Sequence, residues 1–333
     1  MRYNKENKGE RGTDMRKFSI IVPCYQIACR VGRLFSMLAP RDYADYEVIF
    51  VDDCSPDGSY ALMCEAAVNY PNFRVLQTEK NGGPGVARNC GLSHAEGEYI
   101  LFCDSDDELD ITALDGISSF LASHPTADML VFPYEVKKGK RLSLADTYPA
   151  YASGELLSPE DVLRGHVGPT SKVFRRALIA QNALAFPPRM TGEDVCFLFH
   201  FCAVVKEAYK LDIPYYRYIM RRDSLTHSKK TRFEKTTIFE EVAPLLHTRF
   251  PELEVEQFVF HHLLTRAKQM TAAGCSNAEI RAFFEEENRR YPNWIAQFDL
   301  SRQSLYRRLI LTAMSEADPI KIKWIMKLRE LLY

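Results

Sequence analysis

An apolar run that ends abruptly in acidic residues stands at Tyr99-Ile100-Leu101-Phe102-Cys103-Asp104-Ser105-Asp106-Asp107. Its first five residues are typical of a short strand buried on both faces. Similar runs, separated by segments of helical period, occupy 18–23, 47–51, 73–77 and 129–132, and the helical segments are 31–38, 60–69, 85–94 and 111–123. Strand–helix alternation at this spacing predicts an α/β fold with a mainly parallel sheet flanked by helices.

Polar clusters follow three of these predicted strands directly. They are Pro23-Cys24-Tyr25, Asp52-Asp53 and Asp104-Ser105-Asp106. Because ligands of parallel α/β sheets bind outside the carboxyl ends of the strands, we expect a binding site there.

The chain divides by pattern into three parts. Residues 1–17 are polar and are expected to be a flexible N-terminal extension, and residues 18–230 hold the α/β domain. In that domain Ser158, followed by Pro159, predicts a helix start. Residues 231–333 form a predicted helical C-terminal region, with helical periodicity at 234–250, 254–273, 277–290 and 303–313.

Composition excludes several classes of protein. Among 333 residues, 43 Lys and Arg nearly balance 44 Asp and Glu, so we expect no nucleic-acid partner. The nine cysteines are odd in number and form no C-x-x-C pair, which indicates reduced thiols. No apolar run approaches the length of a membrane span, and the N-terminus lacks a secretory signal. We therefore expect a cytoplasmic protein, either free or held at the inner face of the membrane.

The acidic clusters each allow two interpretations. Asp104 and Asp106 offer the hard oxygen ligands of Mg²⁺ or Mn²⁺, or they form an acidic turn before the next helix. Asp53, or its neighbour Asp52, accepts a hydrogen bond from a base or a ribose, or belongs to a plain Pro-Asp-Gly turn.

Two further clusters also each allow a functional and a purely structural interpretation. The glycine-rich segment 81–91 would let backbone approach an anionic ligand at a helix N-terminus, with Arg88 one turn into the helix. Its spacing is neither the G-x-G-x-x-G fingerprint nor a P-loop. Glu193 and Asp194 open an apolar helix, where acids complement the helix dipole, or else one of them is a general base.

In this order the clusters resemble the family-2 glycosyltransferases of the GT-A (Rossmann-like) fold, which are inverting bacterial enzymes that use nucleotide sugars. The resemblance covers about residues 18–228 and rests on the segments 19–25, 47–58, 82–91, 99–107, 172–176, 192–194, 215–218 and 222–226. It implies an enzyme of cell-surface polysaccharide synthesis that transfers a sugar from a nucleoside-diphosphate donor, expected to be a UDP-sugar. The implied acceptor is a hydroxyl of a glycan or of a lipid-linked molecule.

The resemblance also implies roles for single residues. Its donor-binding residues are Pro23, Tyr25, Asp52, Asp53, Gly83, Arg88, Asp104 and Ser105. Pro23 and Tyr25 would line the nucleoside pocket, and Asp53, with Asp52 as the alternative, would bind the base. Arg88 would support the base or the diphosphate.

The implied chemistry is a single displacement assisted by a metal ion. Asp106 and Asp104 would ligate Mn²⁺ or Mg²⁺, and Asp194, with Glu193 beside it, would be the general base. His227 follows the last matching segment and is either a further metal ligand or a plain surface residue of a basic loop.

The last predicted helix lies outside the resemblance. Residues 320–329 are basic and apolar and include a tryptophan, which is typical of a helix at a membrane interface or of a terminal helix packed on the protein body. The first interpretation predicts peripheral membrane contact through this helix. No motif specifies the sugar, the linkage or the oligomeric state.

Other functions fit less well. A catalytically silent nucleotide-sugar-binding or scaffold protein on the same fold is the main alternative, although it would not need both Asp106 and Asp194. A dehydrogenase lacks its dinucleotide fingerprint here, and a sugar-1-phosphate nucleotidyltransferase lacks its N-terminal glycine-rich loop.

Overall fold

The computed structural model describes residues 17–39, 45–188, 192–220, 242, 245, 248–250, 263–264, 266–268, 270–290, 294–297, 300–302 and 304–332. The chain divides into two compact units, Met1–His227 and Ser228–Tyr333, and we describe each by itself. The predicted extension 1–17, apart from Lys17, lies outside the described residues, and so does most of the predicted helices 234–250 and 254–273.

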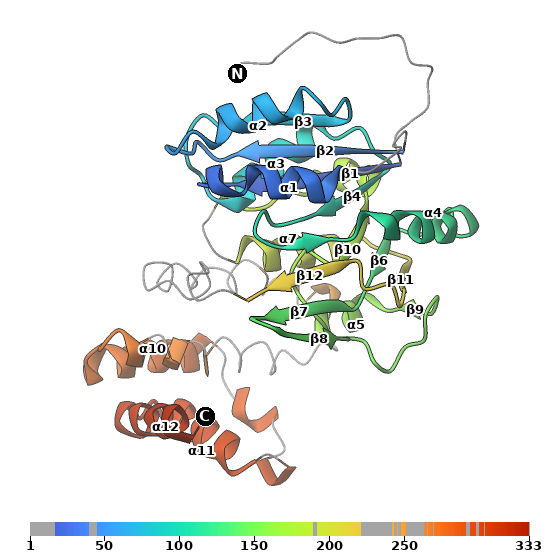
Figure 1. Ribbon diagram of the computed structural model, residues 1–333. Coiled ribbons are helices and arrows are strands. Elements are labelled where there is room, and N and C mark those ends of the chain that lie inside the picture. The colour runs from blue at the N-terminus through green and yellow to red at the C-terminus, as the bar shows by residue number, and fades with distance from the viewer. Residues whose placement is uncertain are drawn as a thin grey trace. The chain divides into compact units, whose positions relative to one another are not determined.

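An eight-stranded sheet forms the centre of the first unit (Figure 1). Its strands are β1 (Phe18–Cys24), β2 (Tyr46–Asp52), β3 (Phe73–Gln77), β4 (Tyr99–Phe102), β6 (Met129–Val131), β9 (Leu156–Leu157), β10 (Lys172–Arg175) and β11 (Ala208–Lys210). Their order is β3-β2-β1-β4-β10-β6-β11-β9. β1 to β4 are parallel, whereas β10 runs antiparallel to both of its neighbours. The predicted mainly parallel sheet is confirmed, and the antiparallel β10 was not foreseen.

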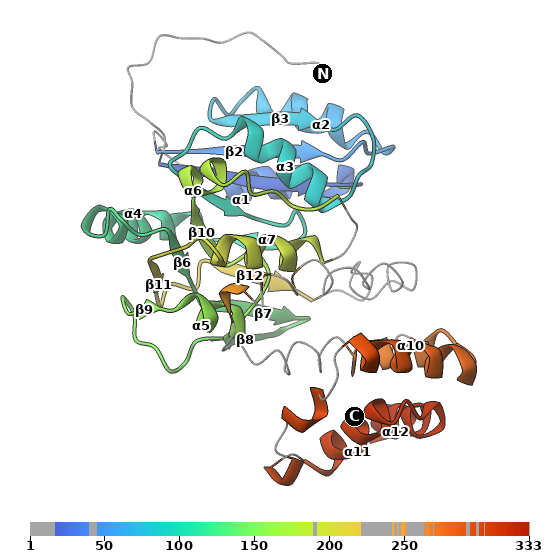
Figure 2. The ribbon, with the colours of Figure 1, turned by 180° about the vertical axis from the view of Figure 1, so that it is seen from behind.

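Helices cover both faces of this sheet because its strands carry apolar residues on both sides. The helices are α1 (Val31–Leu38), α2 (Ser59–Ala67), α3 (Pro84–His94), α4 (Leu114–Ser123), α5 (Pro159–Arg164), α6 (Arg176–Gln181) and α7 (Glu193–Cys202). Phe35 of α1 stacks on Phe50 of β2, with ring centroids 4.3 Å apart. On the other face Gly91 of α3 lies so close to Ile21 that a Cβ there would meet Ile21 Cγ2 at 2.4 Å. Figures 1 and 2 show α1 and α3 on opposite faces.

A second sheet of four strands begins directly after the acidic loop. Its strands are β5 (Glu108–Leu109), β7 (Tyr134–Lys138), β8 (Arg141–Ala145) and β12 (Tyr216–Ile219), in the order β5-β12-β7-β8. These strands were not predicted, because their residues other than Leu109 and Tyr216 are half-buried or exposed, and charged residues interrupt any apolar run. The sheet ties the segment after β4 to a strand more than 100 residues later in the chain.

Several local predictions agree closely with the structure. α1 and β3 have the predicted bounds, and Ser158 caps α5 by accepting a hydrogen bond from the Asp161 amide at 3.1 Å. The segment predicted as one helix from Ile111 to Ser123 is a 3₁₀ turn at Ile111–Ala113 followed by α4. Local signals were therefore sufficient for the elements that are buried and regular.

The described part of the second unit is helical. α10 (Asn277–Arg290), two 3₁₀ turns (Trp294–Gln297 and Leu300–Arg302), α11 (Leu305–Ser315) and α12 (Pro319–Leu332) follow one another. Ile310 and Met314 of α11 are buried, as are Ile322 and Met326 of α12. Within the described residues of the whole chain, no helix is long and apolar enough to cross a bilayer.

Candidate active site

The loops after β1 and β2 bring the first candidate residues together. Pro23 lies within β1 and is buried, whereas the Tyr25 side chain just beyond it is 45% exposed. The Gln26 amide donates to Ser55 Oγ at 2.9 Å, and the Ile27 amide donates to Ser59 Oγ at 2.8 Å. The turn after β2 therefore fixes the backbone that presents Tyr25.

Asp53 holds the glycine-rich loop. Its Oδ1 accepts a hydrogen bond from Thr78 Oγ1 at 2.8 Å, and its Oδ2 accepts one from the Gly83 amide at 2.7 Å. The Gly82 amide donates to both carboxylate oxygens, at 3.1 and 3.2 Å. Gly83 has a φ of +87°, a conformation that other residues rarely adopt. The loop that begins α3 thus depends on Asp53 for its position.

Asp52 is completely buried, and its hydrogen bonds lie at the carboxyl ends of β2 and β3. Its Oδ2 accepts hydrogen bonds from the Ser55 amide at 2.9 Å and from Gln77 Nε2 at 3.0 Å. Its Oδ1 has no hydrogen-bond partner among the residues that the structure describes. Asp52 therefore links the ends of β2 and β3, while Asp53 reaches the loop beside them.

Arg88 is the centre of the candidate site. Its Nη1 donates to Glu193 Oε1 at 2.8 Å and its Nη2 donates to Asp104 Oδ1 at 2.9 Å. The guanidinium carbon lies 5.3 Å from the ring centroid of Phe186. Although burial opposes it, the two carboxylates raise the pKa of Arg88 above its usual value. The sequence interpretation gave Arg88 a ligand contact and did not foresee that it pairs with two other predicted site residues.

Glu193 and Asp194 form the first turn of α7, after Gly192 in the left-handed conformation. Glu193 is buried in its ion pair with Arg88, and Asp194 is half-buried, with Oδ1 accepting the Val195 amide at 2.9 Å. Burial raises the pKa of both carboxyl groups above the usual range, and Arg88 opposes this in each. Since Glu193 is committed to Arg88, Asp194 is the better placed of the two to accept a proton from a ligand.

Two contacts hold α3 against Phe186 and against Glu193 at the start of α7. Asn89 Nδ2 donates to the Phe186 carbonyl at 2.7 Å, and the Phe186 amide donates back to Asn89 Oδ1 at 2.9 Å. Gly85 packs so closely that a Cβ would lie 2.9 Å from Glu193 Cγ and 3.1 Å from the Pro187 carbonyl oxygen. The glycine-rich segment thus positions the acidic pair as well as shaping its own loop.

The acidic loop after β4 has an open part and a buried part. Asp104, Ser105 and Asp106 are half-buried, whereas Asp107 is buried. The Asp107 carboxylate accepts hydrogen bonds from the Tyr216 hydroxyl and from the Ile219 amide. Burial, with the nearby charge of Asp104, raises the pKa of Asp107 to about 7. Asp107 therefore fastens the loop to β12 while its neighbours stay accessible.

The donor set of this loop fits a hard divalent cation. Asp104 and Asp106 supply two partly accessible carboxylates, and Mg²⁺ or Mn²⁺ in such sites takes its remaining ligands from water and substrate phosphates. Within the described part of the chain, no three His, Cys, Asp or Glu side chains converge as a complete metal cage. His227 lies outside the described residues, so its predicted role as a metal ligand stays a prediction.

Sequence reasoning missed Asp107 and Asn89, which organise the site, and Lys172, which holds a loop of the same unit. Lys172 is fully buried, and its Nζ donates to the carbonyl oxygens of His166 at 2.6 Å and Gly168 at 2.8 Å. Burial lowers the pKa of Lys172 to about 7. All three stand inside quoted motifs, but nothing in a linear pattern identifies the distant backbone that each one holds.

The α/β domain gathers carboxylates and an arginine at the carboxyl edge of its sheet, which is where such domains bind their ligands. Residues 19–181 match the family model described as glycosyl transferase family 2. The chain therefore carries a family-2 glycosyltransferase domain, and its fold is GT-A, as the resemblance implied.

Curated relatives cover most of this chain. It is 27% identical over 312 residues to the Staphylococcus aureus poly(ribitol-phosphate) beta-N-acetylglucosaminyltransferase TarS, covering 92% of this chain and 52% of that protein. It is 30% identical over 214 residues to a Bacillus spizizenii poly(ribitol-phosphate) beta-glucosyltransferase, covering 62% of this chain and 33% of that protein. The chain thus spans about half the length, or less, of these relatives.

Solved structures agree with the fold. Residues 1–349 of Staphylococcus aureus TarS, in complex with UDP-GlcNAc, superpose with a TM-score of 0.70 at 22% identity, covering 95% of this chain and 92% of that one. The mannosyltransferase PcManGT from Pyrobaculum calidifontis, in complex with GDP-Man and Mn²⁺, gives a TM-score of 0.52 at 18% identity, covering 94% and 88%.

Proposed function

We propose that this protein is an inverting glycosyltransferase that moves a sugar from a UDP-sugar to a hydroxyl group in cell-surface polysaccharide synthesis. The observation that carries the proposal is the pairing of Arg88 with both Asp104 and Glu193. Three of the family's motifs, which are far apart in the sequence, meet at this guanidinium. The names of the relatives support a poly(polyol-phosphate) or a related glycan as the acceptor.

Asp194 is the proposed general base. Burial raises the pKa of Asp194, with Arg88 opposing the shift, and a raised pKa makes this carboxylate a stronger base than that of an exposed aspartate. It would take the proton of the acceptor hydroxyl as that oxygen attacks the anomeric carbon and the nucleoside diphosphate leaves on the opposite face. One displacement of this kind inverts the anomeric configuration.

The other residues would bind and orient the donor. Tyr25 would lie against the nucleoside, Asp53 would position the glycine-rich loop beside it through the Gly82 and Gly83 amides, and Arg88 would keep Asp104 in place. Asp104 and Asp106 would hold a Mn²⁺ or Mg²⁺ ion, which supplies positive charge to the leaving diphosphate. Glu193 is assigned a positioning role, because its carboxylate is buried against Arg88.

The test is release of UDP from a panel of UDP-sugars, with and without Mn²⁺, in the presence of a polyol-phosphate polymer. We expect one donor to be turned over, and Asp194→Asn to lower kcat about 10²- to 10⁴-fold while donor binding persists. Asp115→Asn, an exposed aspartate on α4, removes the same charge and should leave kcat unchanged. Binding of UDP-sugars without any turnover would favour the silent scaffold and overturn the proposal.

A further inference from the structure

The second unit exposes apolar side chains that its own core does not use. Leu305 and Leu309 on α11 are 65% and 45% exposed, and Ile320 and Trp324 on α12 are 67% and 61% exposed. Each pair is spaced i, i+4, so it forms a stripe on one face of its helix. The core-facing side is formed by other residues, including Ile310 and Ile322. Each helix therefore has a second apolar face.

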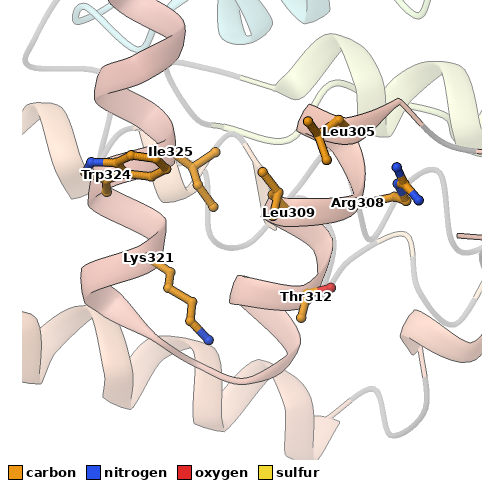
Figure 3. A pocket seen from close by; sticks show the side chains of 7 residues that line it. All are labelled: Leu305, Arg308, Leu309, Thr312, Lys321, Trp324 and Ile325. Atoms are coloured by element: carbon orange, nitrogen blue, oxygen red, sulfur yellow. The ribbon is translucent and has the colours of Figure 1, made fainter.

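The two faces border one groove. A cavity of about 440 Å³ lies between α11 and α12, with Leu309 and Trp324 among its lining residues. Figure 3 shows Leu309 and Ile325 pointing toward one another across it. Its lining is therefore apolar for the most part, and the groove is continuous with the exposed leucine and tryptophan side chains on either side.

Basic residues surround this apolar surface. Arg308 lines the groove, and Lys327 is exposed one turn beyond Trp324. Neither of them forms an ion pair with any residue that the structure describes, whereas Lys321 pairs with Glu316 at 2.6 Å. Residues 304–333 contain six Lys and Arg against three Asp and Glu, a net charge of +3 in a chain whose total is −1. Arg308 and Lys327 thus place positive charge beside the exposed apolar groups.

We propose that this face, formed by Leu305, Arg308, Leu309, Ile320, Trp324 and Lys327, docks on a negatively charged lipid surface. Aliphatic side chains would enter the outer hydrocarbon, the indole would lie at the level of the head groups, and Arg308 and Lys327 would meet lipid phosphates. A second copy of this chain is a poorer occupant, because it would bring Arg308 and Lys327 against like charges. Three aliphatic side chains beside a single aromatic one favour hydrocarbon over nucleic acid.

The proposal does not depend on sugar transfer, and its test needs neither donor nor acceptor. The chain has two tryptophans, of which Trp294 is 4% exposed and Trp324 is 61% exposed. The full chain is titrated with vesicles of phosphatidylglycerol and phosphatidylcholine, and with vesicles of phosphatidylcholine alone. We expect the tryptophan emission to shift to shorter wavelength with the anionic vesicles only. The shift should weaken as salt is added and disappear in Trp324→Phe.

Vesicle sedimentation of matched variants supplies the second measurement. Arg308→Ser with Lys327→Ser should lower the partition constant about 25-fold, since each cation near an anionic surface contributes about fivefold. Leu305→Ser with Leu309→Ser should also release the protein. The matched controls are Leu142→Ser with Leu144→Ser, which are 50% and 60% exposed on β8, and Lys140→Ser with Arg141→Ser. Both controls should bind like the parent chain.

Three results would overturn the proposal. The first is an emission spectrum that anionic vesicles leave unchanged. The second is an equal shift with neutral vesicles, which would remove the role of the cations. The third is a shift that appears without vesicles as the protein concentration rises, which would assign the face to self-association.

Discussion

Arg88 and Glu193, 105 residues apart in the chain, form a buried ion pair with Nη1 and Oε1 separated by 2.8 Å. This contact joins the second turn of α3 to the first turn of α7. Because the same guanidinium also binds Asp104, it connects the glycine-rich loop, the acidic loop and the acidic pair. The candidate site is therefore one charged network rather than three separate motifs.

The first prediction concerns this network. Arg88→Met should lower the free energy of unfolding by about 3–5 kcal/mol, because it leaves the Glu193 carboxylate buried without its partner. The double variant Arg88→Met with Glu193→Leu should be more stable than the sum of the two single changes implies, since it buries no lone charge. Urea denaturation of all four proteins measures the coupling. Strictly additive changes would contradict a direct interaction.

The second prediction uses two glycines. Gly85→Ala should lower stability by about 1–3 kcal/mol and reduce turnover, because the added Cβ would meet Glu193 and the Pro187 carbonyl and displace the start of α7. Gly32→Ala, in α1 with nothing within 4 Å of the new Cβ, should instead raise stability by about 0.5–1 kcal/mol. Thermal unfolding and UDP release are measured on both. Equal effects at the two positions would rule out the packing explanation.

The third prediction concerns the support of the acidic loop. Tyr216→Phe removes a hydroxyl that donates to the buried Asp107 carboxylate, so stability should fall by about 1–3 kcal/mol. Turnover should fall as well, since Asp107 holds Asp104 and Asp106 in place. Tyr70→Phe is the control, because no hydrogen bond of the Tyr70 hydroxyl is present among the described residues. If Tyr216→Phe and Tyr70→Phe changed the free energy of unfolding equally, the hydrogen bond between the acidic loop and β12 would contribute nothing to stability.

The fourth prediction is a pH dependence that arises at His166. Burial, with the positive charge of Lys172, lowers the pKa of His166 from 6.5 to about 3. Between these two values the unfolded chain binds a proton that the folded protein does not, so stability is lost as the pH falls below 6.5. Protonation of this imidazole in the unfolded chain should lower the free energy of unfolding by about 2 kcal/mol between pH 7 and pH 5.

Urea denaturation at the two pH values tests this prediction. The glutamine of His166→Gln does not titrate between pH 7 and pH 5. The variant should therefore lose about 2 kcal/mol less stability than the parent over this range. An identical loss in both proteins would show that the imidazole is protonated in the folded state too.

The sequence predicted the parts of the fold whose signals are local. The apolar runs at 18–23 and 73–77 became β1 and β3, because a strand buried on both faces needs uninterrupted apolar residues. The second sheet could not be predicted in this way. Its strands β7 and β8 carry charged and exposed residues. They form a local hairpin, but this hairpin becomes part of a sheet only where β12 pairs with β7.

The sequence supplied the candidate residues of the site, but it did not predict the contacts between them. Asp53, Arg88, Asp104 and Asp194 were all chosen from the sequence, because acids and glycines at strand ends are recognisable locally. That Asp53 fastens Gly82 and Gly83, or that Asn89 holds the Phe186 backbone, depends on which loops meet at the sheet edge. Such contacts join residues that no spacing rule relates.

The sequence by itself determined an α/β domain of the family-2 type, with its polar clusters at the ends of parallel strands, because hydrophobic periodicity and motif order are properties of the chain. Only the tertiary structure decided which acidic side chains are buried with a partner and which stay accessible. Burial against Arg88 makes Glu193 a partner of the guanidinium, whereas Asp194 beside it is only half-buried. The hydrogen bonds to β12 likewise bury Asp107 and separate it from Asp104 and Asp106. Identical carboxylates differ here because the fold gives each a different set of neighbours and a different access to water.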